Sequence, residues 1–83
     1  MKEIQPVIFP INLGTAIYFN CVGNDNFDTS IIIYYQLLSA ELETLQSGNL
    51  NMDGTDYESY NTSNNGNQYI YDWSANQLGV TLI

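Results

Sequence analysis

The sequence predicts an α+β fold that is mostly β: a small antiparallel sheet of four to five strands with a C-terminal helix packed on it. Three observations lead to this class. Segments with alternating or β-branched apolar residues, separated by turn residues, fill the first two thirds of the chain. Residues 68–78 follow the helical repeat and are followed by a glycine. The chain has 83 residues, which is enough for one small domain, residues 1–83.

The first two expected strands differ in character. Residues 4–11 alternate loosely and contain Pro6 and Pro10. Proline has no N–H to donate to a neighbouring strand, so this segment is expected to be an edge strand or an extended arm. Residues 15–22 alternate more clearly and form the second strand, and residues 23–26 are dense in turn-forming side chains.

The third segment, residues 30–38, is the strongest strand because it is β-branched and aromatic with both faces apolar. Such a strand is central in its sheet or lies against another subunit. Residues 39–48 are ambiguous between a short helix and a turn followed by a strand that reaches Met52. The strand is favoured because a hairpin would pair residues 30–38, and because Leu42 stands where a helical capping box needs Glu or Gln.

A short helical segment is expected after the fourth strand. Thr55 and Glu58 have the spacing of a capping box, with Thr55 as the N-cap residue. Residues 61–67 are polar and are expected to form a loop, in which Asn65 and Gly66 mark a tight turn.

The C-terminal part is expected to hold the main helix and a last strand. Residues 68–78 form the helix, and Gly79 is placed to end it in the left-handed conformation. Residues 80–83 are apolar and are expected to dock on a sheet edge as a short strand.

Composition excludes several kinds of chemistry. Nine acidic residues face one Lys, the formal charge is −8, and there is neither a His nor a second Cys. A Ser-His or Cys-His nucleophile pair, an internal disulfide and a Cys/His zinc site are therefore excluded. The acidity argues against direct binding of nucleic acid or an anionic membrane. The N-terminus lacks the features of a secretory signal, and Cys21 is expected to be a small core residue.

No catalytic, cofactor or metal site is predicted, and an enzyme is the least expected class of protein. The run from Asn49 to Gly54 has the oxygen ligands of the first half of a calcium loop, but Tyr60 stands where the bidentate Glu is required. Acid–base catalysis needs one carboxyl group in an apolar pocket. The two close acidic pairs lie instead in polar turns, where solvated carboxylates are expected: Asp25 with Asp28, and Asp53 with Asp56.

Several parts of the chain resemble small structural proteins of tailed bacteriophages. The matching segments are IFPINLGTA at 8–16, SGNLNMDGTDY at 47–57, YDW at 71–73 and LGVTLI at 78–83. The resemblance implies a non-enzymatic virion protein of the capsid, the tail or the fibre attachment, made in the cytoplasm of the host bacterium. Its partners would be copies of itself and other virion proteins. The group has no motif with an assigned chemical role, so no functional residues are carried over.

The size and composition of the chain also favour contacts with other protein chains. A small chain without a disulfide or a metal has little core of its own, so it is expected to be a homo-oligomer or part of a larger assembly. Strand edges and aromatic anchors would make the contacts. The candidate interface residues are Phe9, Tyr34, Tyr35, Trp73, Leu82 and Ile83.

Two alternatives remain open at this point. A compact acidic domain can inhibit a host defence nuclease by imitating DNA, if its carboxylates gather on one face. The seven tyrosines and Trp73 can also form a platform for sugars in a small carbohydrate-binding module.

Overall fold

The computed structural model describes residues 1–10, 14–27 and 29–83. Four strands are followed by two helices, so the predicted α+β, mostly β class is confirmed. The elements are β1 (Lys2–Phe9), β2 (Gly14–Asp25), β3 (Ser30–Leu38), β4 (Thr44–Asp53), α1 (Gly54–Asn61) and α2 (Gly66–Leu78).

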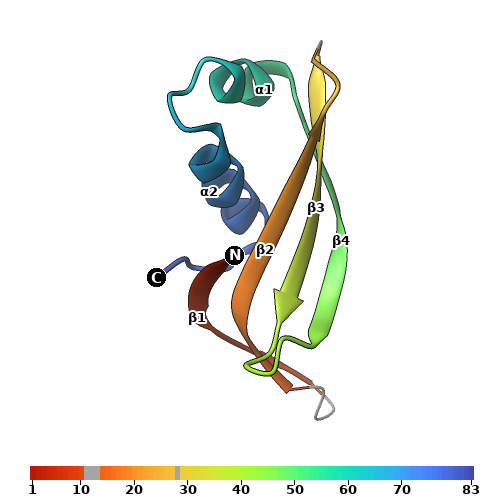
Figure 1. The fold of residues 1–83 in the computed structure, drawn as a ribbon, viewed down its shortest axis with the longest axis vertical. Coiled ribbons are helices and arrows are strands. Elements are labelled where there is room, and N and C mark those ends of the chain that lie inside the picture. The colour runs from red at the N-terminus through yellow and green to blue at the C-terminus, as the bar shows by residue number, and fades with distance from the viewer. Residues whose placement is uncertain (11–13, 28) are drawn as a thin grey trace.

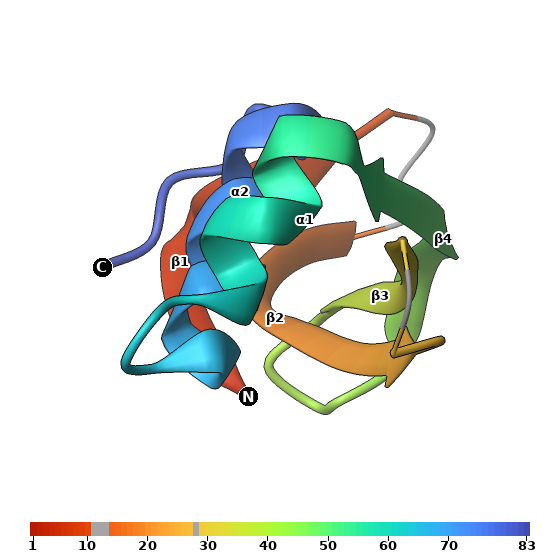
Figure 2. The same ribbon diagram turned by 90° about the horizontal axis from the view of Figure 1, so that it is seen from above.

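The strands form one antiparallel sheet in the order β1-β2-β3-β4, so each strand pairs with its neighbour in sequence. The two helices lie on one side of this sheet (Figure 1). Seen from above, the sheet curves around the helices (Figure 2). The sheet therefore has an inner face, which the helices cover, and an outer face that no other element of the described chain covers.

Four of the expected strands are present, whereas the expected strand at residues 80–83 is only an isolated bridge. Residues 44–53 form β4 after a turn, so the strand interpretation of the ambiguous segment is confirmed. In β1, the pairing with β2 shifts register between Glu3 and Val7, around Pro6, which has no N–H to donate. The apolar C-terminal segment docks on the outer edge of β1, where Leu82 bridges Ile4.

Three boundaries differ from the prediction. The N-cap residue of α1 is Asp53, without a side-chain cap hydrogen bond, so the predicted capping box at Thr55 is wrong. The predicted tight turn at residues 65–66 is instead the start of α2, where Asn65 Oδ1 accepts a hydrogen bond from the backbone N of Gln68 at 3.1 Å. β2 continues to Asp25, which is paired with Ile31, beyond the predicted end at residue 22. Gly79 ends α2 with φ +74°, as predicted.

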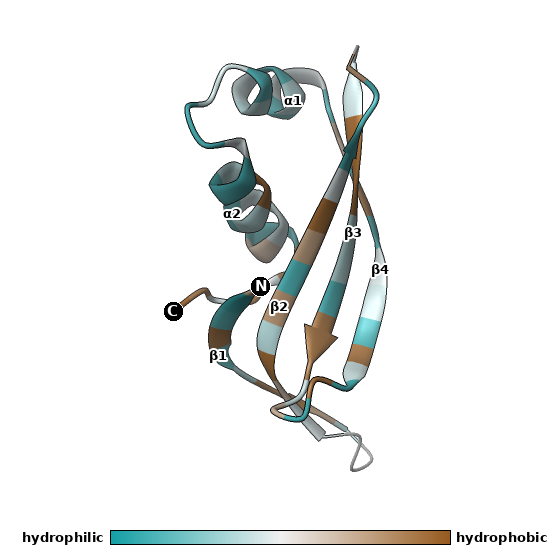
Figure 3. Cartoon of the chain, viewed as in Figure 1, coloured by the Kyte–Doolittle hydropathy of each residue, from teal (hydrophilic) through white to brown (hydrophobic). Residues whose placement is uncertain are grey.

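The core lies between the inner face of the sheet and the helices. Phe19 of β2 is completely buried, and its ring contacts Tyr35 and Tyr71 with centroid separations of 6.5 and 5.8 Å. In Figure 3 the strongly hydrophobic residues are concentrated on β2 and β3, whereas α1 carries none. The largest fully buried side chains are those of Ile4, Phe19, Ile31, Ile33, Met52 and Ser74.

Tyr71 fastens α2 to the sheet beyond the point where β1 stops pairing with β2. Its hydroxyl group accepts a hydrogen bond from the backbone N of Cys21 at 3.2 Å and donates one to Asn20 Oδ1 at 3.3 Å. The single cation of the chain adds to this attachment, because Lys2 Nζ donates to Gln68 Oε1 at 3.0 Å and lies 5.6 Å from the Tyr71 ring centroid. α2 is thus held by polar as well as apolar contacts.

The Tyr71→Phe substitution is expected to lower the free energy of unfolding by about 1–3 kcal/mol, because the buried N–H of Cys21 loses its acceptor. Urea denaturation followed by far-UV circular dichroism measures the change. The same substitution at the exposed Tyr34 is the matched control, with an expected effect within about 0.5 kcal/mol. Equal changes in the two variants would contradict a structural role of the Tyr71 hydroxyl group.

Candidate protein-protein interface

The outer face of the sheet is formed by alternate residues of β2, β3 and β4. In β3, Ile31, Ile33 and Tyr35 are buried on the inner face. Successive side chains of a strand point to opposite faces, so the residues between them point outward. The cross-strand pairs at the centre of this face are Asn20–Gln36, Val22–Tyr34, Asn24–Ile32, Ile32–Asn51, Tyr34–Asn49 and Gln36–Ser47.

Three apolar side chains gather at the centre of this face. Val22, Ile32 and Tyr34 are 57%, 49% and 42% exposed. Val22 lies directly opposite Tyr34, and Ile32 is two residues from Tyr34 on the same face of β3. We call these three residues the outer patch. They explain why the sequence of β3 is apolar on both faces: one face fills the core, and the other remains open.

Uncharged polar groups surround the outer patch. Asn20 Nδ2 donates to Gln36 Oε1 at 3.3 Å, and Gln36 Nε2 donates to Thr44 Oγ1 at 3.0 Å. None of the residues in these six central pairs is charged, although the chain carries a formal charge of −8. The charged residues paired on this face lie toward its margins, where Asp53 is opposite Ser30 and Glu3 is opposite Tyr18. The centres of protein interfaces are depleted of charged residues in the same way.

Most of the carboxylates lie away from the centre of this face. Those of Asp53, Asp56 and Glu58 are at or near α1, whereas Glu41 and Glu43 are in the β3–β4 connection at the opposite end of the molecule (Figure 1). The predicted pair of Asp25 and Asp28 cannot be compared, because residue 28 lies outside the described residues. In the described ranges, no three His, Cys, Asp or Glu side chains gather as a metal-binding group.

Asp25 is held by specific hydrogen bonds. Its Oδ1 accepts one from the Tyr57 hydroxyl group at 2.7 Å and another from the backbone N of Phe27 at 2.8 Å. The carboxylate therefore connects the end of β2 with α1. Sequence reasoning, which treated Asp25 as a solvated turn residue, missed this structural role.

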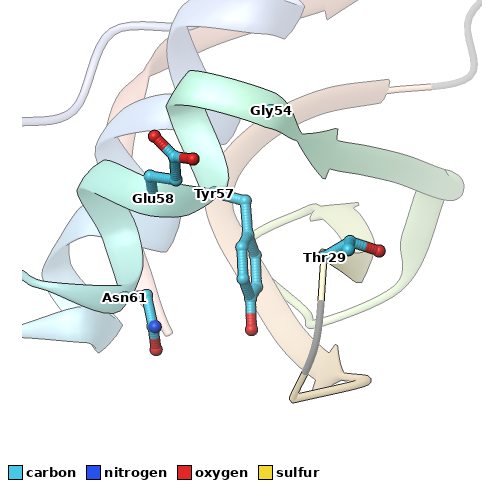
Figure 4. A pocket seen from close by; sticks show the side chains of 5 residues that line it. All are labelled: Thr29, Gly54, Tyr57, Glu58 and Asn61. Carbon is cyan, nitrogen blue, oxygen red and sulfur yellow. The ribbon is translucent and has the colours of Figure 1, made fainter.

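The surface of the described residues includes the following two hollows. The first has a volume of about 220 Å³ and lies between α1 and Thr29, with the Tyr57 ring pointing into the space between them (Figure 4). It offers hydroxyl, amide and carboxylate groups. The second, of about 360 Å³, runs along α2. Its lining residues are Tyr69, Asp72, Trp73 and Asn76.

Much of the tyrosine set packs the helices together. Tyr57, Tyr60 and Tyr69 contact one another in series, with ring centroids 5.9 and 6.3 Å apart. The series joins α1 to α2. Burial raises the pKa of Tyr60, and the nearby Asp25 carboxylate adds to this effect.

The six candidate interface residues do not lie on one surface. Tyr35 is in the core, where its hydroxyl group accepts a hydrogen bond from Gln46 Nε2 at 3.2 Å. Phe9, Trp73 and Leu82 are half-buried against the core. Ile83 is exposed, and its backbone N donates to the Glu3 carbonyl at 3.1 Å. Only Tyr34 belongs to the outer patch.

Sequence reasoning did not select Val22 and Ile32 for the interface. The signal for Ile32 was present in the alternation of β3, because it lies between Ile31 and Ile33 and has the same parity as Tyr34. For Val22, the missing information was the register that places it opposite Tyr34.

Cys21 is buried in the core, as predicted. Burial raises the pKa of its thiol from 9.0 to about 11. Below pH 9 the thiol is protonated in both the folded and the unfolded chain. Above pH 9 the unfolded chain loses its proton first, so ionisation favours unfolding.

We expect the free energy of unfolding to fall between pH 9 and pH 11, and to fall less in a Cys21→Ala variant. The difference is expected to reach about 2 kcal/mol, which is the shift in pKa converted to energy and reduced for partial solvent access. Urea denaturation at several pH values measures both slopes. The interpretation fails if the two proteins lose stability in parallel.

Comparisons with protein-family models, with curated proteins and with solved structures find no match to this chain. Neither of the two helices in the described part of the chain is long and apolar enough to cross a membrane. The outer patch, whose cross-strand partners are uncharged, is the feature of the described surface that best fits a binding function.

Proposed function

We propose that this chain is a non-enzymatic structural component of a tailed-phage virion and acts through protein–protein contacts. The observation that carries the proposal is the outer patch of Val22, Ile32 and Tyr34, whose cross-strand partners are all uncharged. The resemblance of the sequence to small virion proteins supports the assignment to a phage particle.

The energetics favour a protein partner for this face. The inner face is covered by the chain's own helices, so the surface that lacks a cover is the outer one (Figure 2). Val22 and Ile32 are about half exposed, and completing their burial stabilises a complex by about 1 kcal/mol each. The amide side chains around them can form hydrogen bonds with a partner without the cost of burying charge.

Mass spectrometry of purified particles tests the proposal. A phage that encodes this chain is grown, and its particles are purified on a density gradient and washed at high salt. The chain is expected in the particle fraction at a constant ratio to the major capsid protein. A chain that is abundant in the lysate and missing from the particles would refute the proposal.

A second candidate function, the binding of carbohydrate, is favoured by the groove on α2. Tyr69 and Trp73 are half-buried there and stand beside the polar groups of Asp72 and Asn76, a combination suited to sugar rings. It has less support, because a single helix provides all four lining residues, and Asp72 Oδ1 already accepts a hydrogen bond from Gln68 Nε2 at 2.9 Å. Saturable quenching of the Trp73 fluorescence by soluble oligosaccharides would favour it.

The charge distribution gives little support to the alternative function, the inhibition of a nuclease by imitation of DNA. A mimic needs its carboxylates on one face with a spacing similar to that of phosphates. Here the carboxylates near α1 and those of the β3–β4 connection stand at opposite ends of the long axis (Figure 1).

A further inference from the structure

One edge of the sheet is covered by another segment of the described chain, and the other edge is not. The outer edge of β1 is covered by the C-terminal segment, where the Gln5 backbone N donates to the Thr81 carbonyl at 2.9 Å and Leu82 bridges Ile4. β4 pairs with β3 on one side, and no strand of the described chain pairs with its other side. One edge is therefore closed by the chain itself, and the other is left open.

The central part of the open edge lacks the features that usually prevent strand pairing. Natural edge strands are protected by Pro, by Lys or other charges, or by bulges that twist them away. Between Gln46 and Met52, β4 has neither a Pro nor a charged residue, and its pairing with β3 is regular; the register shift of this strand pair lies beyond Gln46. These seven residues present an uncharged edge about 23 Å long, in a molecule whose longest dimension is 41 Å.

We propose that β4 pairs antiparallel with β4 of a second copy of the chain and joins the two sheets into one. This inference rests on the proposed function and names one of its partners. Backbone groups of an open edge are self-complementary in an antiparallel pair, so a copy of the same strand satisfies them fully. Joining the copies in this way places both outer patches on the same side of one sheet and the helices on the other.

The charges determine the register. Residues directly opposite each other in an antiparallel pair point to the same face. The two-fold axis must therefore lie midway between one residue and the same residue of the copy. Centring the pair on Gly48 would place Glu43 opposite Asp53 of the copy, which is repulsive. Centring it on Asn49 pairs the whole uncharged stretch of residues 46–52 with itself and separates those two carboxylates. Asn49 is therefore the central residue, facing its own copy on the outer face.

Disulfide trapping tests the pairing. An Asn49→Cys variant places two thiols opposite each other at the axis, within the separation that a disulfide requires. The native Cys21 does not interfere, because it is buried and its thiol has a raised pKa. Val22→Cys is the matched control, since it lies on the same face in β2, two strands away from the edge. Circular dichroism checks that both variants are folded.

Under mild oxidation at micromolar concentration, Asn49→Cys is expected to give roughly tenfold more covalent dimer than Val22→Cys, because pairing raises the effective concentration of the two thiols. The yield is expected to rise with salt, which screens the repulsion between two copies of charge −8.

Two results would overturn the inference. Preferential dimerisation of Val22→Cys would mean that copies stack through their outer faces and not through β4. If the chain is found in purified particles and neither variant forms a dimer, the open edge of β4 is covered by other virion proteins and not by a second copy. In both cases the proposed function stands, whereas a chain that is absent from particles refutes the proposed function itself.

Discussion

Replacing Phe19 with alanine is expected to lower the free energy of unfolding by about 3–5 kcal/mol. The ring is 0% exposed and contacts Tyr35 of β3 and Tyr71 of α2, so its removal opens a cavity between the sheet and the helix. Small domains have a total stability of about 5–15 kcal/mol, and this one is near the lower limit of domain size. The variant is therefore expected to be largely unfolded near its normal working temperature.

Thermal and urea denaturation measure the loss, with near-UV circular dichroism as a probe of aromatic packing. Phe27→Ala is the matched control, because Phe27 is 88% exposed in the β2–β3 connection. The control is expected to change stability by less than about 0.5 kcal/mol. A loss below about 1 kcal/mol in Phe19→Ala would contradict the assignment of Phe19 to the centre of the core.

The Ile32→Lys substitution is expected to prevent assembly while leaving the fold intact. Ile32 is half exposed at the outer patch, so a lysine there can extend into solvent in the free chain. In a complex the same ammonium group would be buried at the apolar centre of the interface, which is strongly unfavourable. Binding is expected to weaken by about 2 kcal/mol or more, which is roughly 30-fold.

Incorporation into particles and self-association are both measured for this variant. Ile8→Lys makes the same chemical change at an 82% exposed position of β1, away from the outer patch, and is expected to assemble normally. The role of the outer patch would be contradicted if both variants entered particles equally well.

The sequence predicted the order of the strands because their local signals agree with the global fold. β3 is apolar on both faces and lies inside the sheet, between β2 and β4. β4 formed as its hairpin partner in spite of helix-forming residues near its start. Pairing with β3 outweighs the weak helical propensity of residues 39–48.

The start of α1 and the end of β2 depend on backbone conformation and hydrogen bonds that the sequence pattern does not reveal. α1 begins two residues early because Gly54, with φ +58°, turns the chain directly from β4 into the helix. β2 is longer than predicted because Asn26 closes the hairpin within a few residues: its Oδ1 accepts hydrogen bonds from the backbone N of Thr29 at 3.0 Å and of Ser30 at 3.1 Å.

The interface was less predictable than the fold. The residue type of an apolar side chain such as Trp73 or Tyr35 does not show whether the side chain lies in the core or in an interface with another protein. Which of the two apolar faces of β3 remains open depends on where α1 and α2 dock, and no residue of β3 encodes that choice. The open face, and the strand register that brings Val22 to Tyr34, are visible only in three dimensions.

Sedimentation velocity of the purified chain over a wide range of concentrations tests most directly whether the outer face and the open edge bind protein. The weight-average sedimentation coefficient is expected to rise with concentration and with salt, above the value for a 9.4 kDa monomer. Adding proteins released from purified particles should shift the chain further into larger complexes. A single monomeric species at every concentration, unchanged by those proteins, would contradict the account.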